Sequence, residues 1–496
     1  MKNTQGLYFT TSGGLEYYYD DCSGLCFPSP EGLAEDLQRI TKGIQLREGL
    51  KEECWGRFIC SRAQAYGAFL HKDESSSTPA ATDLATLETK IYTKGFRQLI
   101  LVVTESCNLR CRYCIFSENY PFVRPKAGSS MSHDVAIMAT RYYLDQVEQI
   151  RKRNPSHPVL ITFYGGEPLL NYPLIEAVIS HVRSRGVQNV TFSVSTNGLL
   201  LDDRISDYLV ENDVSIAVSL DGPQSEHDRN RVTAGGEGSF SRVFSNLERF
   251  WSRHPNYPYL IFLVTYDIGT NLHEVRRFFN GDPRFRKSLF MFSQASPNFT
   301  EYYRQFSQEQ LQGFRRMARE IKKNLMDSRG IYGYNDPMLD FLFGMPMYLC
   351  VKRPIFGPLG REEIPATSTC LPGDKLCVMP SGEIEVCERA PGLKIGSIEN
   401  GLDFKLIKKL IDDYNRSITS HCKNCPATRL CGSCFATFWS GKTFSFPWDG
   451  FCKNRVAMAK EMLEDVWSVL EANPGYFNQS NNIDQRSFRR LKALSI

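Results

Sequence analysis

The hydrophobic pattern from about residue 96 alternates between two kinds of segment. Short, nearly continuous apolar stretches, typical of buried strands, lie at residues 98–104, 158–163, 190–195, 214–220, 259–265 and 288–293. Between them, apolar residues recur with a helical period, as in the helix predicted to start at Ser132. Buried strands that alternate with amphipathic helices predict an α/β fold with a parallel sheet and right-handed crossovers. Six such units are too few for a closed eight-stranded barrel. We therefore predict an open, partial (β/α)6 TIM barrel with its chemistry on loops at the carboxyl ends of the strands.

The regions on either side of this pattern differ from it. Residues 6–28 contain three short aromatic strands, and a helix is predicted over residues 29–40. The polar segment 72–83 is expected to be a linker. A long amphipathic helix is predicted over 307–328, and from about 340 to 455 Gly, Pro and Cys become dense. Because this last region is too rich in loops to be stabilised by core burial alone, we expect bound ligands to hold it together.

Composition narrows the class of protein. The chain has 496 residues, 42% apolar and 23% charged, as is ordinary for a soluble globular protein. Lys and Arg exceed Asp and Glu by 59 − 55 = +4, which does not suggest a nucleic-acid partner. No apolar run approaches the length of a membrane span, and the N-terminus has no signal-peptide core. We therefore expect a soluble, cytoplasmic protein without a membrane partner, whose 16 cysteines serve metal binding or catalysis rather than disulfides.

The first cysteine cluster follows the first predicted strand of the sheet. Cys107, Cys111 and Cys114 are spaced C-x3-C-x2-C on the loop after residues 98–104. Three thiolates bind three irons of a cubic 4Fe–4S cluster and leave the fourth iron open, whereas a structural zinc site would want four ligands. The alternative is three buried cysteines that have this spacing by chance. The position at the end of the first strand favours the cluster.

This motif resembles the signature of the radical S-adenosylmethionine (radical SAM) superfamily, with Tyr113 at its aromatic position. The resemblance implies that the open iron binds the amino and carboxylate groups of SAM. One electron from the cluster then cleaves the sulfonium and yields a 5′-deoxyadenosyl radical that abstracts a hydrogen atom. It also implies an electron donor such as ferredoxin or flavodoxin.

Three further segments follow successive predicted strands in the order of that family: YGGEP at 164–168, STNG at 195–198 and SLDGP at 219–223. Alone, each could be a turn or a set of surface charges. By resemblance, Glu167 would accept a hydrogen bond from the SAM ammonium, and Arg231 would bind the SAM carboxylate. The residues assigned in this way to SAM binding are Tyr113, Gly165, Gly166, Glu167, Ser195, Asn197, Ser219 and Arg231.

A second array of cysteines lies near the C-terminus. Cys422, Cys425, Cys431, Cys434 and Cys452 are spaced C-x2-C-x5-C-x2-C-x17-C, and Cys370 and Cys387 enclose Gly382 as C-x11-G-x4-C. Paired C-x2-C units also occur in zinc ribbons, but five cysteines do not suit one tetrahedral ion. The array resembles a SPASM domain, which implies two auxiliary 4Fe–4S clusters and therefore three clusters in all. The spacing between Cys431 and Cys434 is one residue shorter than usual in that family.

The SPASM resemblance assigns ligands to each auxiliary cluster. The second cluster would be bound by Cys422, Cys425, Cys431 and Cys452, and the first by Cys370, Cys387 and Cys434. The fourth ligand of the first cluster is left open between Cys350, Cys377 and no protein ligand, in which case a substrate thiolate could bind. Cys22, Cys26, Cys54 and Cys60 are expected to be small buried hydrophobic residues.

The N-terminal strands resemble the winged-helix leader-binding domain of ribosomal-peptide modifying enzymes, although a capping domain is the alternative. The resulting plan is a winged-helix-like leader-recognition domain at 1–85, a radical SAM partial barrel at 95–305 and linker helices at 306–345. A SPASM auxiliary-cluster domain at 346–465 and a helical tail at 466–496 follow.

Within this group, the sequence around the first cluster and the chain length resemble maturases that form thioethers in a precursor peptide, such as ranthipeptide and sactipeptide synthases. Two alternatives are an anaerobic sulfatase-maturating enzyme, which forms formylglycine, and a SPASM enzyme that forms C–C bonds. Sulfatase maturases carry Asp after the cysteine that matches Cys387, whereas this chain has Glu388, which we consider as a general base, a solvated charge or a substrate contact. A non-enzymatic iron–sulfur or zinc scaffold would leave the SAM-binding segments without a purpose.

Overall fold

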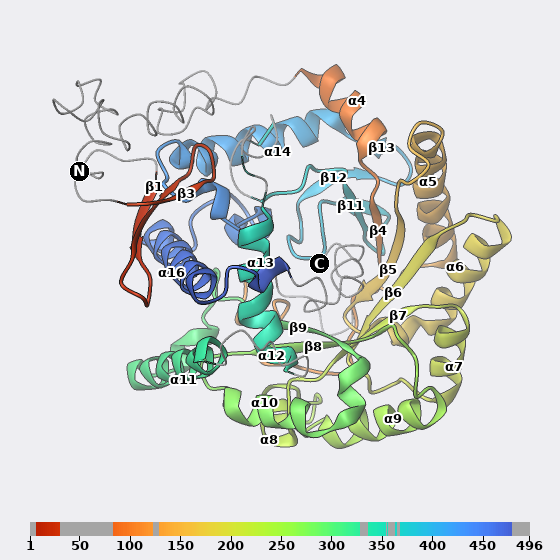
Figure 1. Cartoon of the computed structure of the whole chain (residues 1–496). Coiled ribbons are helices and arrows are strands. Elements are labelled where there is room, and N and C mark those ends of the chain that lie inside the picture. The colour runs from red at the N-terminus through yellow and green to blue at the C-terminus, as the bar shows by residue number, and fades with distance from the viewer. Residues whose placement is uncertain are drawn as a thin grey trace.

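The computed structural model describes residues 6–29, 83–122, 128–327, 336–353, 355, 363–364 and 368–478. The helix predicted over 29–40, Cys54, Cys60 and residues 479–496 of the predicted tail lie outside this part of the chain. Figure 1 shows a large twisted sheet with helices along its outer side, a small sheet near the N-terminus, and helices between the two. No helix in the described part of the chain is long and apolar enough to cross a membrane.

All six predicted strands of the barrel are present and parallel, and they lie side by side in chain order. They are β4 (Gln98–Thr104), β5 (Val159–Gly165), β6 (Val190–Thr196), β7 (Ser215–Ser219), β8 (Leu260–Tyr266) and β9 (Leu289–Gln294). Their carboxyl ends meet at one edge of the sheet because every neighbouring pair is parallel. The alternating pattern of the sequence therefore predicted this part of the fold correctly.

Helices cover the outer face of these strands (Figure 1). They are α5 (His133–Arg151), α6 (Tyr172–Ser184), α7 (Asp203–Glu211), α9 (Phe240–Arg253) and α10 (Leu272–Gly281). Ser132 caps α5 as predicted, with its side chain accepting from the Val135 backbone N–H. A short helix, α8 (Gln224–Asn230), follows β7 and was not expected from the pattern. Outward-facing side chains of β4, such as Leu99 and Leu101, are fully buried in the core that these helices complete.

The sheet continues into the cysteine-rich region. β10 (Lys375–Val378) pairs in parallel with β4, and β11 (Glu383–Glu385), β12 (Lys394–Ser397) and β13 (Gly401–Leu402) extend it antiparallel. α14 (Phe404–Ser417) packs beside α4 (Leu84–Lys94). One sheet therefore contains strands from both sides of the boundary that was predicted between the barrel and the C-terminal region.

A second apolar core joins the N-terminal sheet to the C-terminal helices. β1 (Gly6–Thr10), β2 (Glu16–Asp20) and β3 (Cys26–Pro28) form an antiparallel sheet, as the aromatic strand pattern predicted. Leu7, Phe9 and Tyr19 of this sheet are buried together with Leu463 and Val466 of α16 (Phe451–Ala472). This core also includes α13 (Met345–Lys352), which is reached from α11 (Gln308–Asp327) through α12 (Pro337–Leu339) and a π-helical turn, η4 (Asp340–Gly344).

Candidate active site

The loop after β4, residues 105–117, is called the cysteine loop here. It carries the predicted cluster ligands Cys107, Cys111 and Cys114. Backbone hydrogen bonds fix it against the segment that follows α8: the N–H of Arg110 donates to Val232 O at 2.7 Å, and that of Arg112 to Asn230 O at 3.0 Å. The loops after β4 and β7 are thus joined at the carboxyl edge of the sheet, where such folds carry their chemistry.

Several N–H groups lie within reach of the thiols of this loop. The Leu109 backbone N–H donates to Cys107 Sγ at 3.4 Å, and Asn197 Nδ2 lies 3.9 Å from the same sulfur. An Arg231 guanidinium nitrogen lies 3.9 Å from Cys111 Sγ. Hydrogen bonds to sulfur orient thiolate ligands and tune the metal centre that they hold.

The three thiols of the cysteine loop lie near one another. Cys107, Cys111 and Cys114 influence one another's ionisation. No group of three His, Cys, Asp or Glu among the described residues is placed to hold a single metal ion. In a cubic 4Fe–4S cluster each thiolate binds a different iron, and three thiolates leave the fourth iron open. Burial raises the pKa of the Cys111 thiol to about 12, so metal binding must displace its proton. The residues present therefore fit such a cluster.

The two glycines of the YGGEP segment bring the loop after β5 against the cysteine loop. A Cβ on Gly165 would lie 2.1 Å from Thr104 O, and one on Gly166 2.2 Å from Ser106 O. The Glu167 backbone N–H donates to Ser106 O at 2.9 Å. The two glycines thus let the backbone after β5 lie close to the chain next to Cys107.

Glu167 is buried and surrounded by donors. Its carboxylate accepts from the Leu169 N–H at 3.1 Å, from the Thr196 hydroxyl at 2.7 Å and from the Asn197 N–H at 2.7 Å. Burial raises its pKa to about 6, although these hydrogen bonds oppose the shift. A carboxylate has about four acceptor positions, so three are used by the chain. Glu167 thereby ties the loop after β5 to the loop after β6.

The remaining predicted residues of β6 and β7 lie along the same edge. Ser195 and Ser219 face the inner side of the sheet near the carboxyl ends of their strands, in line with Ala217 and Leu263. The Asn197 side chain follows β6 and donates to Asn108 Oδ1 at 2.7 Å within the cysteine loop.

Asp221 connects the aromatic residue of the motif to Arg231. Its Oδ2 accepts from the Tyr113 hydroxyl at 2.5 Å and from Arg231 Nε at 3.0 Å, and its Oδ1 accepts from the Thr265 N–H at 2.9 Å. The Arg231 guanidinium lies over the Tyr113 ring, 5.6 Å from its centroid. Tyr113, Asp221 and Arg231 are each more than nine-tenths buried. Asp221 was not predicted, because its only signal in the sequence is its place in the SLDGP segment.

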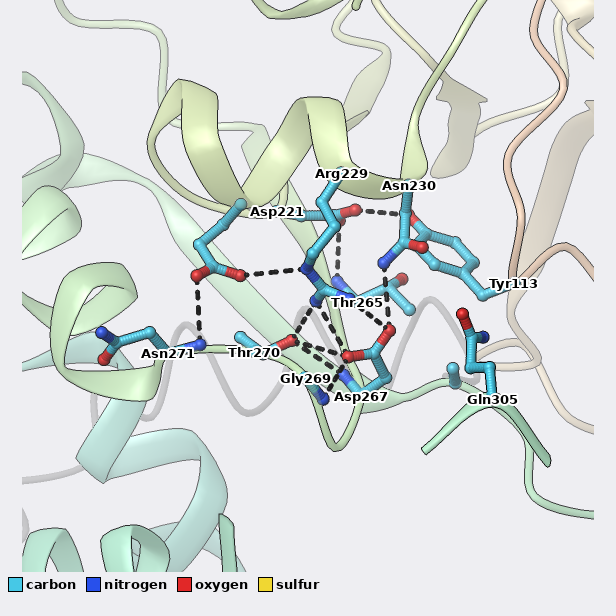
Figure 2. A network of polar contacts seen from close by, with 12 residues as sticks. Tyr113, Asp221, Arg229, Asn230, Thr265, Asp267, Gly269, Thr270, Asn271 and Gln305 are labelled. Atoms are coloured by element: carbon cyan, nitrogen blue, oxygen red, sulfur yellow. Dashed lines mark hydrogen bonds and ion pairs between the residues drawn. The ribbon is translucent and has the colours of Figure 1, made fainter. Parts of the chain in front are cut away.

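A second buried network lies beside the first (Figure 2). Asp267, which is fully buried, accepts from Arg229 at 2.9 Å, from Asn230 Nδ2 at 3.1 Å and from the Tyr302 hydroxyl at 2.5 Å. Burial alone would raise the pKa of Asp267, but hydrogen bonds from Arg229 and Tyr302 and the charge of Arg229 lower it below its usual value. This network fixes the loop that leads into Arg231. It was not predicted, because Asp267 and Tyr302 belong to no sequence motif.

Some of the C-terminal cysteines influence one another's ionisation. Cys452 does so with Cys425 and Cys431, and Cys387 does so with Cys434. Their assignment to two clusters stays a prediction. Burial raises the pKa of Cys387 to about 12. Cys422, at the end of η5 (Thr419–Cys422), precedes Cys425 along the chain, and Cys370 is exposed.

The candidates for a fourth ligand differ in their surroundings. Cys377 lies in β10 opposite Ile100, and its thiol is fully buried with Ile100 and Val102 on the inner face of the sheet. Cys350 is buried in the core shared with the N-terminal sheet, where it interacts with Cys26. Glu388 has one carboxylate oxygen, Oε2, that is buried and has no hydrogen-bond partner among the described residues.

Part of the chain is similar to known proteins. Residues 101–280 match the family model described as Radical SAM superfamily. The chain is 32% identical over 154 residues to the radical SAM cyclopropyl synthase TigE of Paramaledivibacter caminithermalis, covering 30% of this chain and 31% of that protein. It is 24% identical over 207 residues to a cysteine-type anaerobic sulfatase-maturating enzyme of Clostridium novyi, covering 41% and 51%. The matches thus span a third to a half of the length of these relatives.

A solved structure shares the fold over a longer stretch. It is described as native anSMEcpe with bound AdoMet and Cp18Cys peptide, and the match covers 78% of this chain and 99% of that one. The TM-score is 0.50 and the sequence identity 19%, so the likeness concerns the fold alone.

Proposed function

We propose that this chain, which contains a radical SAM domain, is an enzyme that forms thioether crosslinks in a ribosomally made precursor peptide. The observation that carries the proposal is the group of three thiols at the carboxyl edge of the sheet, with N–H donors near the sulfurs of Cys107 and Cys111. When bound there, a reduced 4Fe–4S cluster and SAM supply the 5′-deoxyadenosyl radical that removes a hydrogen atom from carbon.

The chain's own residues would hold SAM beside the three thiols. The proposed set is Tyr113, Gly165, Gly166, Glu167, Ser195, Asn197, Ser219 and Arg231, all on or directly after β4 to β7 or on the loop after α8. Small polar side chains such as Ser195 and Ser219 suit a ribose. Glu167 has one acceptor position that the chain does not use, and we assign it to the SAM ammonium.

The C-terminal thiols would hold two further clusters, three in all. The interactions within Cys425, Cys431 and Cys452 and between Cys387 and Cys434 support two separate groups. Closing a thioether from a carbon radical and a thiol releases one electron and one proton. An auxiliary cluster is a suitable acceptor for the electron, and an external carrier such as ferredoxin or flavodoxin would supply the electron that starts each cycle.

The substrate is proposed to be a peptide with a leader. A relative in the comparison is described as a sulfatase-maturating enzyme, and a solved neighbour holds a Cys-containing peptide, as its description states. Within the described residues, β1 and β3 are the edge strands of their three-stranded sheet, and an extended leader can add to a sheet edge as a further strand. In the cytoplasm, such a leader would bring the precursor to the barrel.

The preference for a thioether rests on resemblance and on Glu388. Sulfatase maturases carry Asp at this place, whereas Glu388, next to Cys387, presents a buried Oε2 that receives no hydrogen bond from the part of the chain that the structure describes. A buried carboxylate oxygen without a donor is costly, so a substrate group that donates to it would be stabilised. We assign Glu388 the role of base for the substrate thiol proton. Formylglycine formation is the second candidate, supported by the sulfatase-maturating relative.

The first experiment tests the radical chemistry. Replacing Cys107, Cys111 and Cys114 by Ala in the full chain should abolish formation of 5′-deoxyadenosine, while the auxiliary clusters stay bound. Iron analysis and absorption of anaerobically reconstituted protein check the second half of this expectation. Undiminished 5′-deoxyadenosine from the triple variant would place the chemistry elsewhere in the protein.

The second experiment identifies the bond. A thioether leaves the peptide lighter by two hydrogen atoms and removes one alkylatable thiol per crosslink. Formylglycine formation from Cys instead replaces the thiol and one hydrogen by an aldehyde oxygen. High-resolution mass spectrometry with thiol alkylation separates the two. A loss of two hydrogens that leaves every Cys alkylatable would contradict the thioether and indicate C–C coupling or desaturation.

A further inference from the structure

Arg231 brings a buried positive charge to one of the three thiols. Its guanidinium nitrogen lies 3.9 Å from Cys111 Sγ, and the residue is 7% exposed. The neighbouring Asn197, which lies at the same distance from Cys107 Sγ, offers only a neutral amide. Cys107 and Cys111 therefore each have a side-chain N–H group at the same distance from the sulfur, neutral for Cys107 and positively charged for Cys111.

Asp221 fixes the direction of this guanidinium. Its carboxylate receives Arg231 Nε, the Tyr113 hydroxyl and the Thr265 N–H, so it is held from three sides. The Asp221 N–H in turn lies 3.4 Å from His227 Nδ1. Because Nε is bound to Asp221 and one face lies on the Tyr113 ring, the guanidinium end is turned toward Cys111.

We infer that Arg231, held in place by Asp221, is the charged hydrogen-bond donor to the Cys111 sulfur and raises the reduction potential of a cluster bound at Cys107, Cys111 and Cys114. The inference rests on the proposed function, which puts a cluster on these thiols. It adds a second role to the SAM contact proposed for Arg231, because Nε and one terminal nitrogen of the guanidinium lie on Asp221 and Cys111.

The physical reason is electrostatic. Hydrogen bonds to the ligand sulfurs and nearby positive charge stabilise the more negative, reduced form of a cluster. Burial keeps solvent from screening the charge, so its effect is larger than that of a charge on the surface. Asp221 offsets part of this charge, but the guanidinium lies between the carboxylate and the sulfur. The positive charge of Arg231 therefore lies closer to the Cys111 sulfur than the negative charge of Asp221 does.

The test is a redox titration of the full, reconstituted protein without SAM. Arg231→Gln should reduce the ratio of reduced to oxidised cluster at a fixed potential at least tenfold, which corresponds to a midpoint about 59 mV more negative. The signal is assigned by its absence from the variant with Ala at Cys107, Cys111 and Cys114, and iron analysis verifies loading. An unchanged midpoint in Arg231→Gln would overturn the inference.

Matched variants separate this role from general charge effects. Arg112→Gln removes the same charge from an exposed position on the same loop and should leave the midpoint nearly unchanged. Equal shifts in both variants would overturn the inference. Asp221→Asn loosens Arg231 but also removes the negative charge that offsets it, so the two effects oppose each other and the midpoint should shift less than in Arg231→Gln. The double variant Asp221→Asn with Arg231→Gln removes both charges and leaves no unpaired buried carboxylate, so its midpoint should lie between those of Arg231→Gln and the unsubstituted protein.

SAM affinity, measured separately, distinguishes the two roles of Arg231. If Arg231→Gln binds SAM more weakly but keeps the midpoint measured without SAM, then Arg231 is a SAM ligand only. That result would overturn the inference and leave the proposed function standing. If the unsubstituted protein shows no cluster signal that depends on the three cysteines, the proposed function falls as well.

Discussion

At the scale of single residues, Gly165 sets the distance between two loops. Its φ of +153° lies in a region that favours glycine, and a Cβ there would lie 2.1 Å from Thr104 O. The next residue, Gly166, donates its N–H to the same carbonyl at 2.9 Å. Any side chain at 165 must therefore push the loop after β5 away from the start of the cysteine loop.

We expect Gly165→Ala to destabilise the protein by at least about 1–3 kcal/mol, from backbone strain alone, and to weaken iron retention at the first cluster. Chemical denaturation and iron analysis after desalting measure the two effects. Gly281→Ala is the control, because nothing lies within 4 Å of a Cβ built there. Full stability and full iron content in Gly165→Ala would mean that the two loops do not need this contact.

Residues of this site could be predicted only where they belong to a recognisable sequence motif. The cysteine spacing indicated three thiols together, and the structure brings them together. Asp221, Asp267 and Tyr302 were not predicted, because an isolated Asp or Tyr gives no sign of burial until neighbouring strands and loops enclose it. Glu167 was predicted to bind a ligand. Its contacts to Thr196 and Asn197 were not predicted, because they depend on how the end of β6 is placed beside the loop after β5.

At the scale of elements, strand length decided what the sequence could show. The six barrel strands are five to seven residues long and nearly continuous in apolar residues, so their pattern is clear. The segment around Cys377 forms an antiparallel hairpin of β10 and β11. Its parallel pairing with β4 was not predicted, because four residues do not specify which distant strand they will join.

The π-helical turn η4 contains a half-buried acid, Asp340. Asp340 makes no side-chain hydrogen bond or ion pair with a described residue, and burial together with the nearby charge of Asp336 raises its pKa to about 7. π-helical turns within helices are frequent at functional positions and cost some helix stability. The folded protein keeps the Asp340 proton at pH values at which the unfolded chain has lost it.

The stability of the protein should therefore fall as pH rises from about 4 to about 7, since the unfolded chain binds fewer protons over this range. Asp340→Asn removes this contribution. We expect the variant to be more stable than the unsubstituted protein at pH 8 by roughly 1–2 kcal/mol, less than the full linkage value because the carboxyl partly meets water. At pH 4 the two proteins should be nearly equal.

Chemical denaturation between pH 4 and 8 measures this difference. Asp412→Asn, which removes a surface carboxylate paired with Lys408, is the control and should not change the slope over this range. Parallel pH profiles for Asp340→Asn and the unsubstituted protein would contradict the role assigned to this carboxyl.

At the scale of the whole molecule, the N-terminal sheet is fastened to the cysteine-rich region. Arg429 lies between Cys425 and Cys431 along the chain, and its guanidinium donates to Asp21 O at 2.7 Å and to Cys22 O at 2.6 Å. Asp21 is fully buried, and its Oδ1 accepts from the Arg429 N–H at 2.9 Å. The turn between β2 and β3 is thus in direct contact with the segment proposed to hold the second auxiliary cluster.

This contact could not be read from the sequence, because the two partners are some four hundred residues apart along the chain and neither belongs to a recognisable motif. It also affects how leader binding should be tested. Deleting residues 1–85 would uncover the apolar residues that Leu7, Phe9 and Tyr19 bury on α13 and α16. Loss of activity on deletion would then report exposed core as well as a lost leader site, so single substitutions are the better test.

Arg429→Gln should loosen the N-terminal sheet and the cysteine segment together. The variant loses two charge-assisted hydrogen bonds, each worth about 1.5–3 kcal/mol, while the backbone contact to Asp21 remains. Hydrogen exchange followed by mass spectrometry should speed up both in residues 16–28 and in residues 422–434. Arg416→Gln, whose side chain is 77% exposed, is the control and should leave both segments unchanged.

The pattern of exchange then decides whether the two parts open as a unit. Faster exchange in both segments with retained iron means that Arg429 joins them mechanically, and faster exchange with lost iron means that the sheet also supports the auxiliary site. Faster exchange in residues 16–28 alone would show that the N-terminal sheet opens independently. In that case the binding of a leader to the N-terminal sheet could not influence the auxiliary cluster through the Arg429 contact. Any influence of the leader on the reaction would then depend on the packing of the sheet against α13 and α16.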